Sequence, residues 1–463
     1  MSSNVDVVIV GAGVTGLTAA TRLTEAGYDV VVLEARDRIG GRLWTDTVDG
    51  VRLELGGQWI SPDQSALIET LDELGLQTFS RYREGASVYV GRDGVRRTFD
   101  GSAFPVSEYT EAEVDRLTVV LDELAAQMDP LNPWDMPGAA ELDRMSFAAW
   151  LREQTDDQEA RDNIALYIGA AMLTKPAHAF SALSAVLMAA SAGSFSHLVD
   201  ADFILDRRVK GGLQQVPLLR AEKLGSKVIT CAPVTAISYD SAGATVRTVS
   251  GHEWHAKRVI LAVPPTLVSR IAFSPNLPPV QMQARQHQSF GIVIKLHITY
   301  PTPFWREAGL SGTAFSPYQV VHEAYDNTNH DDNRGTLVGF VSDENADRLL
   351  ELTPDERRAC VLASLTTYYG EQAREPLAYY ESRWMAEEWT AGAYATSFAI
   401  GGLTRYGARL REPIGPISFG SSDVAGLGFQ HVDGAIRVGR MLADELIAER
   451  LGQTTEITTQ APA

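Results

Sequence analysis

The sequence predicts an α/β protein built on a doubly wound, Rossmann-like dinucleotide-binding domain, with a second, α+β domain inserted into it. Two observations support this fold class. The chain opens with an apolar strand, a glycine turn, a helix and a second strand, the order that binds a dinucleotide. Further buried strand patterns and a glycine-rich C-terminal segment recur after residue 200, beyond a long region of helical periodicity. The dinucleotide-binding domain is therefore expected to be assembled from separate stretches of chain.

The first element is a buried parallel strand. Val5 to Val10 is rich in β-branched residues, the composition of a strand that is covered on both faces. The turn Gly11 to Gly16 follows, and a helical stretch leads to a second apolar run, Val30 to Leu33, which ends at Glu34. An acidic residue about 20 positions after the glycine turn completes the dinucleotide fingerprint in its required context.

Each fingerprint residue has a physical role. Gly11 permits the tight turn, Gly13 lets the backbone approach a pyrophosphate, and Gly16 lets helix and strand pack closely. Thr15 lies at the helix N-terminus, whose free N–H groups can bind phosphate. Glu34 can accept hydrogen bonds from a ribose 2′-hydroxyl. The fingerprint alone does not choose between NAD and FAD.

The composition narrows the classes of partner and compartment. Asp and Glu outnumber Lys and Arg by 59 to 40, a formal net charge of -19, which argues against nucleic acid or an anionic membrane as partner. The acidic surface either attracts a cationic substrate or serves solubility alone. Cys231 and Cys360 form no CxxC pair, so no metal site or disulfide framework is expected. No signal peptide or membrane span is apparent, and we expect a cytoplasmic protein with a flexible tail at 453–463.

The residues after the fingerprint favour FAD. The segment that runs from Glu34 through Ala35 and Arg36 to Gly41 and Arg42 resembles the extension found in the flavin amine oxidase family. The resemblance implies that the glycines and Arg42 lie against the FAD pyrophosphate, a role that suits a guanidinium because it binds phosphate oxygens in a bidentate way. On the residues alone, a solvated basic loop stays open as the alternative.

The resemblance extends from Val5 to about Leu451 and implies where other segments meet the cofactor. One segment passes beside the flavin ring, one strand contacts the adenine, and a C-terminal helix points its N-terminus at the flavin, where its dipole stabilises negative charge. The further residues that the resemblance assigns to FAD are Gly56, Gly57, Gln58, Trp59, Val234, Trp389, Asp423 and Val432.

The resemblance also divides the chain into two domains. Between the cofactor segments, Ser107 can cap a helix that runs to about Met128 with apolar residues at helical spacing. The expected FAD-binding domain comprises residues 1–80, 209–294 and 395–452, and the expected substrate-binding domain comprises residues 81–208 and 295–394.

A strand with a lysine in its middle is the first candidate for chemistry. Phe290 to Tyr300 alternates as a strand, with Lys295 on the face opposite Ile294 and Leu296. A lysine in this position is unusual unless that face is wet or functional. A snorkelling or ion-paired lysine is the alternative from the residues alone. In the family, the matching lysine holds a water against N5 of the flavin.

Two further residues match the aromatic cage that faces the flavin in the family. Tyr394 would form one wall, and His431 stands where many relatives place a second tyrosine. The cage would hold a neutral amine nitrogen against the flavin. Ala393 stands where relatives can attach the flavin through cysteine, so the resemblance implies non-covalent FAD. From sequence alone, Tyr394 is also compatible with an ordinary core position.

Substrate choice depends on Glu323. The segment from Val320 to His330 closely resembles the bacterial putrescine oxidase subgroup, in which a glutamate receives the far ammonium of the substrate. The assignment is physically sound because a diamine reacts at one neutral nitrogen while the other stays cationic, and a buried cation needs a paired carboxylate. The alternative is a surface glutamate in an acidic protein.

The resemblance implies an enzyme that oxidises putrescine with O2 and H2O to 4-aminobutanal, NH3 and H2O2, the aldehyde then cyclising to 1-pyrroline. The expected catalytic residues are Lys295, Tyr394 and His431, with Glu323 binding the substrate. The alternatives are a monoamine or polyamine oxidase, an inactive FAD-bound partner-binding protein, and an NAD-dependent dehydrogenase. Oxidation of L-amino acids is less expected because no arginine is recognisable as a carboxylate ligand. A homodimer is implied by the resemblance alone.

Overall fold

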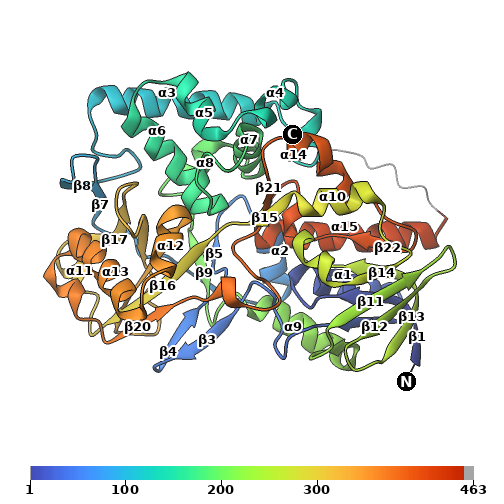
Figure 1. Cartoon of the computed structure of the whole chain (residues 1–463). Coiled ribbons are helices and arrows are strands. Elements are labelled where there is room, and N and C mark those ends of the chain that lie inside the picture. Colours follow the sequence, from blue (N-terminus) through green and yellow to red (C-terminus); the bar gives the residue numbers. More distant parts are fainter. Residues whose placement is uncertain (1, 453–463) are drawn as a thin grey trace.

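The computed structural model describes residues 2–452 and contains two large sheets with a group of helices beside them (Figure 1). An eight-stranded sheet lies on the right of the view, a seven-stranded sheet on the lower left, and helices α3 to α8 above it. The predicted combination of a doubly wound sheet and a second α+β part is confirmed. The tail at 453–463, expected to be flexible, lies outside the described residues.

The eight-stranded sheet contains the predicted N-terminal unit. Strand β1 (Ser2–Val10) pairs in parallel with β2 (Val30–Leu33), and helix α1 (Val14–Glu25) connects them. The strand order is β10-β2-β1-β13-β12-β11-β14, with β22 also paired to β13, so segments more than 400 residues apart share one sheet. The remaining strands are β10 (Val228–Ile229), β11 (Val234–Tyr239), β12 (Ala244–Thr248), β13 (Glu253–Leu261), β14 (Ala272–Ser274) and β22 (Ile417–Phe419).

Alternation of apolar side chains lets this sheet bury both faces. Val7 and Ile9 pack with α1 and the C-terminal helix α15 (Val432–Arg450) on one face, whereas Val8 and Val10 belong to a second core on the other. Helices α1 and α15 approach closely because of a glycine: a Cβ at Gly439 would lie 2.5 Å from the Thr15 carbonyl. The N-termini of both helices are thereby brought to the same region.

One face of the seven-stranded sheet packs in an apolar core against helices, and the other face lines a cavity. Its order is β20-β16-β19-β18-β17-β7-β8. Ile294 and Leu296 of β16 pack in a core with helices α12 and α13, while Lys295 points to the opposite face, as the alternation predicts. The elements are β7 (Ala86–Val90), β8 (Arg96–Phe99), β16 (Val293–Tyr300), β17 (Leu310–Phe315), β18 (Glu323–Asp326), β19 (Gly335–Ser342), β20 (Ala378–Glu381), α11 (Phe304–Glu307), α12 (Asp343–Leu350) and α13 (Pro354–Tyr369).

The strand expected over Phe290 to Tyr300 is broken into two, which corrects the prediction. Strand β15 (Gln288–Phe290) pairs with β21 (Thr396–Phe398) in a separate two-stranded sheet, and β16 begins only at Val293. The break lies at Gly291, where a Cβ would come within 1.9 Å of Thr174 Oγ1. The chain must pass another backbone segment at this point, so it cannot continue one ladder.

The helical part begins as predicted. Ser107 caps α3 (Glu108–Ala126) by accepting a hydrogen bond from the backbone N–H of Thr110, and the helix ends two residues before the expected Met128. The other helices here are α4 (Ala139–Arg144), α5 (Phe147–Gln154), α6 (Gln158–Ala165), α7 (Ala182–Ser191) and α8 (Phe195–Val199). Smaller elements complete the fold: α2 (Ser65–Glu73), α9 (Gln215–Leu224), α10 (Pro279–Gln286), α14 (Gly402–Tyr406), β3 (Thr45–Val48), β4 (Val51–Glu54), β5 (Trp59–Ile60), β6 (Thr78–Ser80) and β9 (Arg207–Val209).

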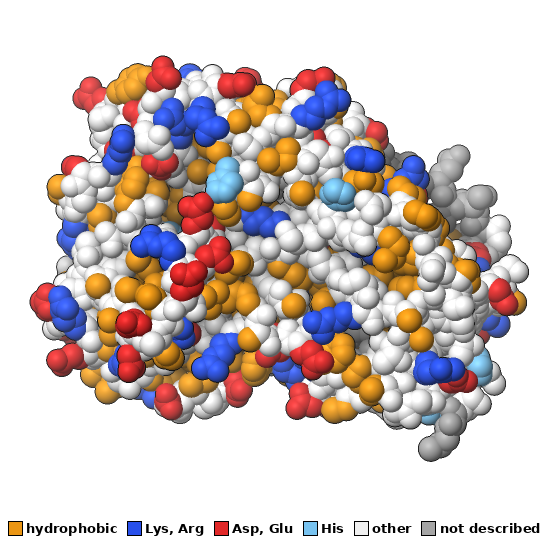
Figure 2. Space-filling view, viewed as in Figure 1, with side chains coloured by type: hydrophobic (Ala, Val, Ile, Leu, Met, Phe, Trp, Pro, Cys, Tyr) orange, Lys and Arg blue, Asp and Glu red, His pale blue; other side chains and the backbone are white. Residues whose placement is uncertain are grey.

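The surface is mixed in charge. On the face shown in Figure 2, basic side chains are scattered singly among acidic and apolar ones. Among residues 2–452, no helix is long and apolar enough to cross a membrane.

Candidate active site

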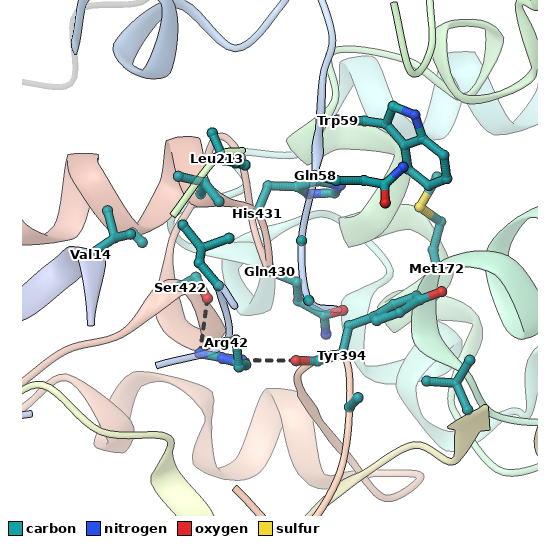
Figure 3. Close-up of a pocket in the computed structure, with 18 of the residues that line it drawn as sticks. Val14, Arg42, Gln58, Trp59, Met172, Leu213, Tyr394, Ser422, Gln430 and His431 are labelled. Atoms are coloured by element: carbon teal, nitrogen blue, oxygen red, sulfur yellow. Dashed lines mark hydrogen bonds between the residues drawn. The ribbon is translucent and has the colours of Figure 1, made fainter. Parts of the chain in front are cut away.

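A cavity of about 370 Å³ lies between the eight-stranded and the seven-stranded sheet (Figure 3). The glycine turn after β1 lines one part of it, and the interior face of β16 and β18 lines another. The sequence-predicted residues that line it are Gly11, Gly13, Thr15, Glu34, Ala35, Arg36, Gly41, Arg42, Gly56, Gly57, Gln58, Trp59, Val234, Lys295, Glu323, Trp389, Tyr394, His431 and Val432. Gly16 and Asp423 do not line the cavity, so neither is placed to touch a ligand in it.

The fingerprint turn has the geometry that phosphate binding requires. Gly11 has a φ of +105°, and a Cβ there would lie 2.8 Å from the Ala262 carbonyl, so only glycine fits. At Gly13 a Cβ would meet nothing within 4 Å, which leaves the backbone open toward the cavity at the start of α1. Gly16 acts in packing instead, since a Cβ would lie 2.0 Å from the Gly11 carbonyl.

Glu34 is held rigidly at the end of β2. It is buried, and its two carboxylate oxygens accept the backbone N–H groups of Ala12 at 2.8 Å and Arg36 at 3.0 Å. A carboxylate fixed in this way keeps lone pairs available for a ribose hydroxyl.

Arg42 connects the cofactor part of the cavity to the cage. Its guanidinium forms a bidentate pair with Asp423, at 2.7 and 3.2 Å. It also donates to the Tyr394 carbonyl and to Ser422 Oγ, each at 3.1 Å (Figure 3). Although burial opposes ionisation of Asp423, the charge and hydrogen bonds of Arg42 hold the pKa of this carboxyl below its usual value. Asp423 therefore acts through Arg42, and this explains why a predicted cofactor residue is away from the cavity wall.

Lys295 is fixed in the site by three hydrogen bonds. Its Nζ donates to the carbonyls of Glu54 and Gly56 at 2.7 Å each and to Gln58 Oε1 at 2.6 Å. Burial lowers the pKa of Lys295 to about 7, with Arg208 adding to the effect and Glu54 opposing it. These three acceptors match the three N–H donors of an ammonium.

A polar chain behind Lys295 was not found from sequence. The Gln58 side chain donates to Asn327 Oδ1 at 2.7 Å, and the Asn327 amide lies 3.4 Å from His297 Nδ1. His297 is fully buried, and burial together with the charges of Lys295 and Arg208 holds its pKa well below the usual value. The alternation of β16 places His297 on the Lys295 face, which was the one available signal.

The two cage residues come from separate segments. Burial and the nearby charge of Glu323 raise the pKa of Tyr394 well above its usual value, so its phenol stays neutral. His431 is the N-cap residue of α15, and its Nδ1 lies 2.8 Å from the Phe429 carbonyl. A carbonyl only accepts, so Nδ1 carries the proton and Nε2 of the neutral ring is an acceptor.

Glu323 lines the cavity on β18 and is 6% exposed. The Tyr325 hydroxyl donates to its Oε2 at 2.7 Å, and His322 Nε2 lies 3.5 Å from its Oε1. Tyr167 is also close, since burial and the charge of Glu323 both raise its pKa. The expectation of a buried carboxylate, not a surface one, is met.

The same part of the cavity contains an arginine that sequence reasoning missed. Arg81 lines the cavity at 6% exposure, and its guanidinium lies 5.2 Å from the ring centroid of Tyr325. It donates to the Leu205 carbonyl at 3.2 Å and to Thr313 Oγ1 at 3.0 Å. The sequence carries no signal for Arg81, because it follows the short strand β6, where a cation ordinarily faces solvent.

Comparison with known proteins identifies the family. The family model described as flavin containing amine oxidoreductase matches residues 14–447. The chain belongs to this family. It is 55% identical to putrescine oxidase of Kocuria rosea over 453 residues, which covers 96% of this chain and 95% of the relative. Among solved structures, putrescine oxidase bound to putrescine superimposes with a TM-score of 0.96 at 60% identity, covering 97% of this chain and all of the other. Cyclohexylamine oxidase of Brevibacterium oxydans superimposes with a TM-score of 0.91 at 30% identity, over 97% of this chain and 100% of the other.

The enzyme is thus a flavin-dependent oxidoreductase, and the family implies FAD as its cofactor. The residues present fit this group. The turn at Gly13 is open to the cavity at the start of α1, Glu34 is fixed where a ribose would lie, and the N-terminus of α15 reaches the cavity at His431 and Val432. A NAD-dependent dehydrogenase is excluded by the family assignment.

Proposed function

We propose that this enzyme catalyses the FAD-dependent oxidative deamination of putrescine, consuming O2 and H2O and forming 4-aminobutanal, NH3 and H2O2. The observation that carries the proposal is the buried Glu323 carboxylate in a cavity that also contains Lys295 and the Tyr394–His431 pair. A monoamine has no group that needs such a carboxylate, whereas a diamine brings a second ammonium to it. The high identity to putrescine oxidase supports the same substrate.

Each of these residues has a separate role in binding or reaction. Glu323 binds the distal ammonium, and the Tyr325 hydroxyl keeps this carboxylate in place. Tyr394 and His431 flank the reacting amine, which is neutral, and His431 Nε2 is available to accept one of its N–H groups. FAD, when bound, supplies the two-electron oxidation of the amine carbon and passes the electrons to oxygen. Lys295 would hold a water beside the ring by exchanging one of its three protein acceptors for that water.

We propose non-covalent FAD because Ala393 has no nucleophile. Its carbonyl accepts the Thr174 hydroxyl at 2.8 Å, so the segment before Tyr394 is fixed by hydrogen bonding. Precipitation of the purified enzyme with acid should release all of the flavin into the supernatant. Flavin retained in the pellet would contradict non-covalent binding.

Anaerobic stopped-flow absorbance tests the main proposal. Putrescine mixed with the oxidised enzyme should bleach the flavin band rapidly, and butylamine should do so much more slowly. Equal rates for the two amines would favour a monoamine oxidase, and no bleaching with any amine would favour the inactive FAD-bound alternative. Faster bleaching with spermidine than with putrescine would favour a polyamine oxidase.

The division into an FAD-binding domain (1–80, 209–294, 395–452) and a substrate-binding domain (81–208, 295–394) stays a proposal, as does a homodimer. The eight-stranded sheet lies within the first set of segments, whereas the boundary after residue 294 cuts β16 of the seven-stranded sheet two residues after its start at Val293. Sedimentation equilibrium of the FAD-loaded enzyme measures the oligomeric state directly, and a mass of one chain would contradict the dimer.

A further inference from the structure

Arg81 is a buried cation inside a cavity that we assign to a cationic substrate. Among residues 2–452, no carboxylate oxygen lies within 4 Å of its guanidinium. Its partners are uncharged: the Leu205 carbonyl and the Thr313 hydroxyl, with the face of the Tyr325 ring at 5.2 Å. Burial and the neighbouring Arg83 lower the pKa of Arg81 to about 10, which still leaves it charged at neutral pH.

The other charges near Arg81 are already neutralised. Arg83 pairs with Asp206 at 2.9 Å, and Asp326 pairs with Arg306 at 2.7 Å. Arg81 therefore contributes a full positive charge to this part of the cavity, where screening by solvent is weak.

Tyr325 connects this cation to the anchor. The Tyr325 hydroxyl donates to Glu323, and Arg81 lies over the ring of the same tyrosine. The region around Tyr325 thus contains one carboxylate and one uncompensated guanidinium. A single distal ammonium gains direct contact with Glu323, which outweighs the more distant guanidinium. The other carboxylates that line the cavity are Glu34, which accepts two backbone N–H groups, and Asp63, whose charged neighbours include His431 and His197. A further ammonium beside Tyr325 would meet the positive charge of Arg81.

We propose that Arg81 is a specificity-determining residue that limits the substrate to one distal positive charge, so that the enzyme discriminates against polyamines by charge and not by length. The proposal rests on the proposed diamine function, in which Glu323 binds the distal ammonium. Aromatic side chains also line the cavity, so the effect of length has to be measured separately from the effect of charge: Phe99, Phe104, Tyr167, Phe203 and Phe315.

The test separates charge from length with two substrates that share a diaminobutane unit. Spermidine carries a third nitrogen on its aminopropyl extension, and N-butylputrescine has the same number of heavy atoms with a methyl group in that place. Values of kcat/KM are measured for putrescine, spermidine and N-butylputrescine. In the wild type, N-butylputrescine should be oxidised at least tenfold more efficiently than spermidine. Equal efficiencies would overturn the proposal without any variant.

Two variants then locate the effect. Arg81→Met removes the charge and keeps most of the side-chain volume. We expect it to raise the ratio of kcat/KM for spermidine to kcat/KM for putrescine at least tenfold. The corresponding ratio for N-butylputrescine should stay unchanged. Arg81→Lys keeps the charge and should preserve the wild-type ratios within about twofold. An equal gain for both extended amines in Arg81→Met would mean that the cavity has merely loosened around Leu205, and it would overturn the proposal.

Failure of the proposed function is distinguishable from failure of this inference. A wild-type enzyme that oxidises none of the three amines overturns both. If the wild type oxidises putrescine well but does not discriminate between spermidine and N-butylputrescine, the proposed function stands and only the role of Arg81 is overturned.

Discussion

Replacing Glu323 by glutamine removes the charge that we assign to the distal ammonium and changes little else. The amide is nearly isosteric, and its oxygen can still accept the Tyr325 hydroxyl that Glu323 accepts at 2.7 Å. The substrate ammonium, however, would be buried without a counter-charge. Because Glu323 is only 6% exposed, the relevant comparison is a buried ion pair that loses one partner, which costs about 3–5 kcal/mol.

This cost converts into a kinetic prediction. At about 1.4 kcal/mol for each factor of ten, kcat/KM for putrescine should fall by about two to three and a half powers of ten. Butylamine provides the control, because it has the same carbon chain without the distal nitrogen. With butylamine the wild-type carboxylate has no cationic partner, so Glu323→Gln should leave its kcat/KM unchanged or raise it.

Peroxide formation, coupled to a peroxidase in air-saturated buffer, measures both amines with the same enzyme preparation. Glu323→Asp retains the charge on a shorter side chain, so its kcat/KM for putrescine should lie between those of the wild type and the glutamine variant. The reasoning is refuted if Glu323→Gln lowers kcat/KM for putrescine and butylamine by the same factor. A loss below tenfold for putrescine would likewise show that the distal ammonium is bound elsewhere.

Three further variants test other parts of the site and the fold. At pH 6, below the pKa of about 7 of Lys295, the Lys295→Met variant should slow reoxidation of the reduced enzyme by oxygen about a hundredfold, measured by double-mixing stopped flow, since it lacks the cationic group beside the ring; an unaltered rate would contradict the assigned role. Arg42→Lys loses the bidentate contact to Asp423 and should raise the Kd for FAD about ten- to a hundredfold in a fluorescence titration of the apoprotein, and an unchanged Kd would show that Arg42 does not bind the cofactor. Burial lowers the pKa of Lys175 to about 8, so between pH 8 and 10 this lysine is neutral in the folded protein and charged in the unfolded one. The unfolding free energy of the wild type should therefore rise relative to Lys175→Met by about 1.4 kcal/mol per pH unit in that window, measured by chemical denaturation; a constant difference would refute the shift.

The dinucleotide-binding part was predictable because its constraints are local. Gly11 and Gly16 lie within a few residues of the strand and helix that they connect, and at each position a Cβ would collide with a backbone carbonyl. The same holds for Ser107, whose capping hydrogen bond spans three residues. In these cases the residues that cause the structure lie within a few positions of each other, so the sequence pattern is sufficient to predict it.

The strand break at Gly291 could not be predicted, because its cause lies more than 100 residues away. Phe290 to Tyr300 alternates without interruption in the sequence, but Thr174 occupies the space beside Gly291 and forces the chain to leave one sheet before it enters the next. The partners of Lys295 were hidden for the same reason. Two of them are backbone carbonyls, of Glu54 and Gly56, which have no side-chain signature at all.

The positions of the charged side chains in the cavity favour a diamine as the ligand. Lys295 lies beside the region assigned to the flavin, and burial brings its pKa down to about 7, so above neutral pH it loses most of its positive charge. Glu323 and Arg81 lie around Tyr325, where the carboxylate can contact a ligand and the guanidinium offers only repulsion. A ligand with one neutral and one cationic nitrogen is therefore oriented by the site itself, its cation toward Glu323 and its neutral amine toward Tyr394. In the proposed binding mode, a ligand with no distal charge leaves Glu323 without a cationic partner, and a ligand with an additional charge meets Arg81, so we expect both departures from a simple diamine to bind less well.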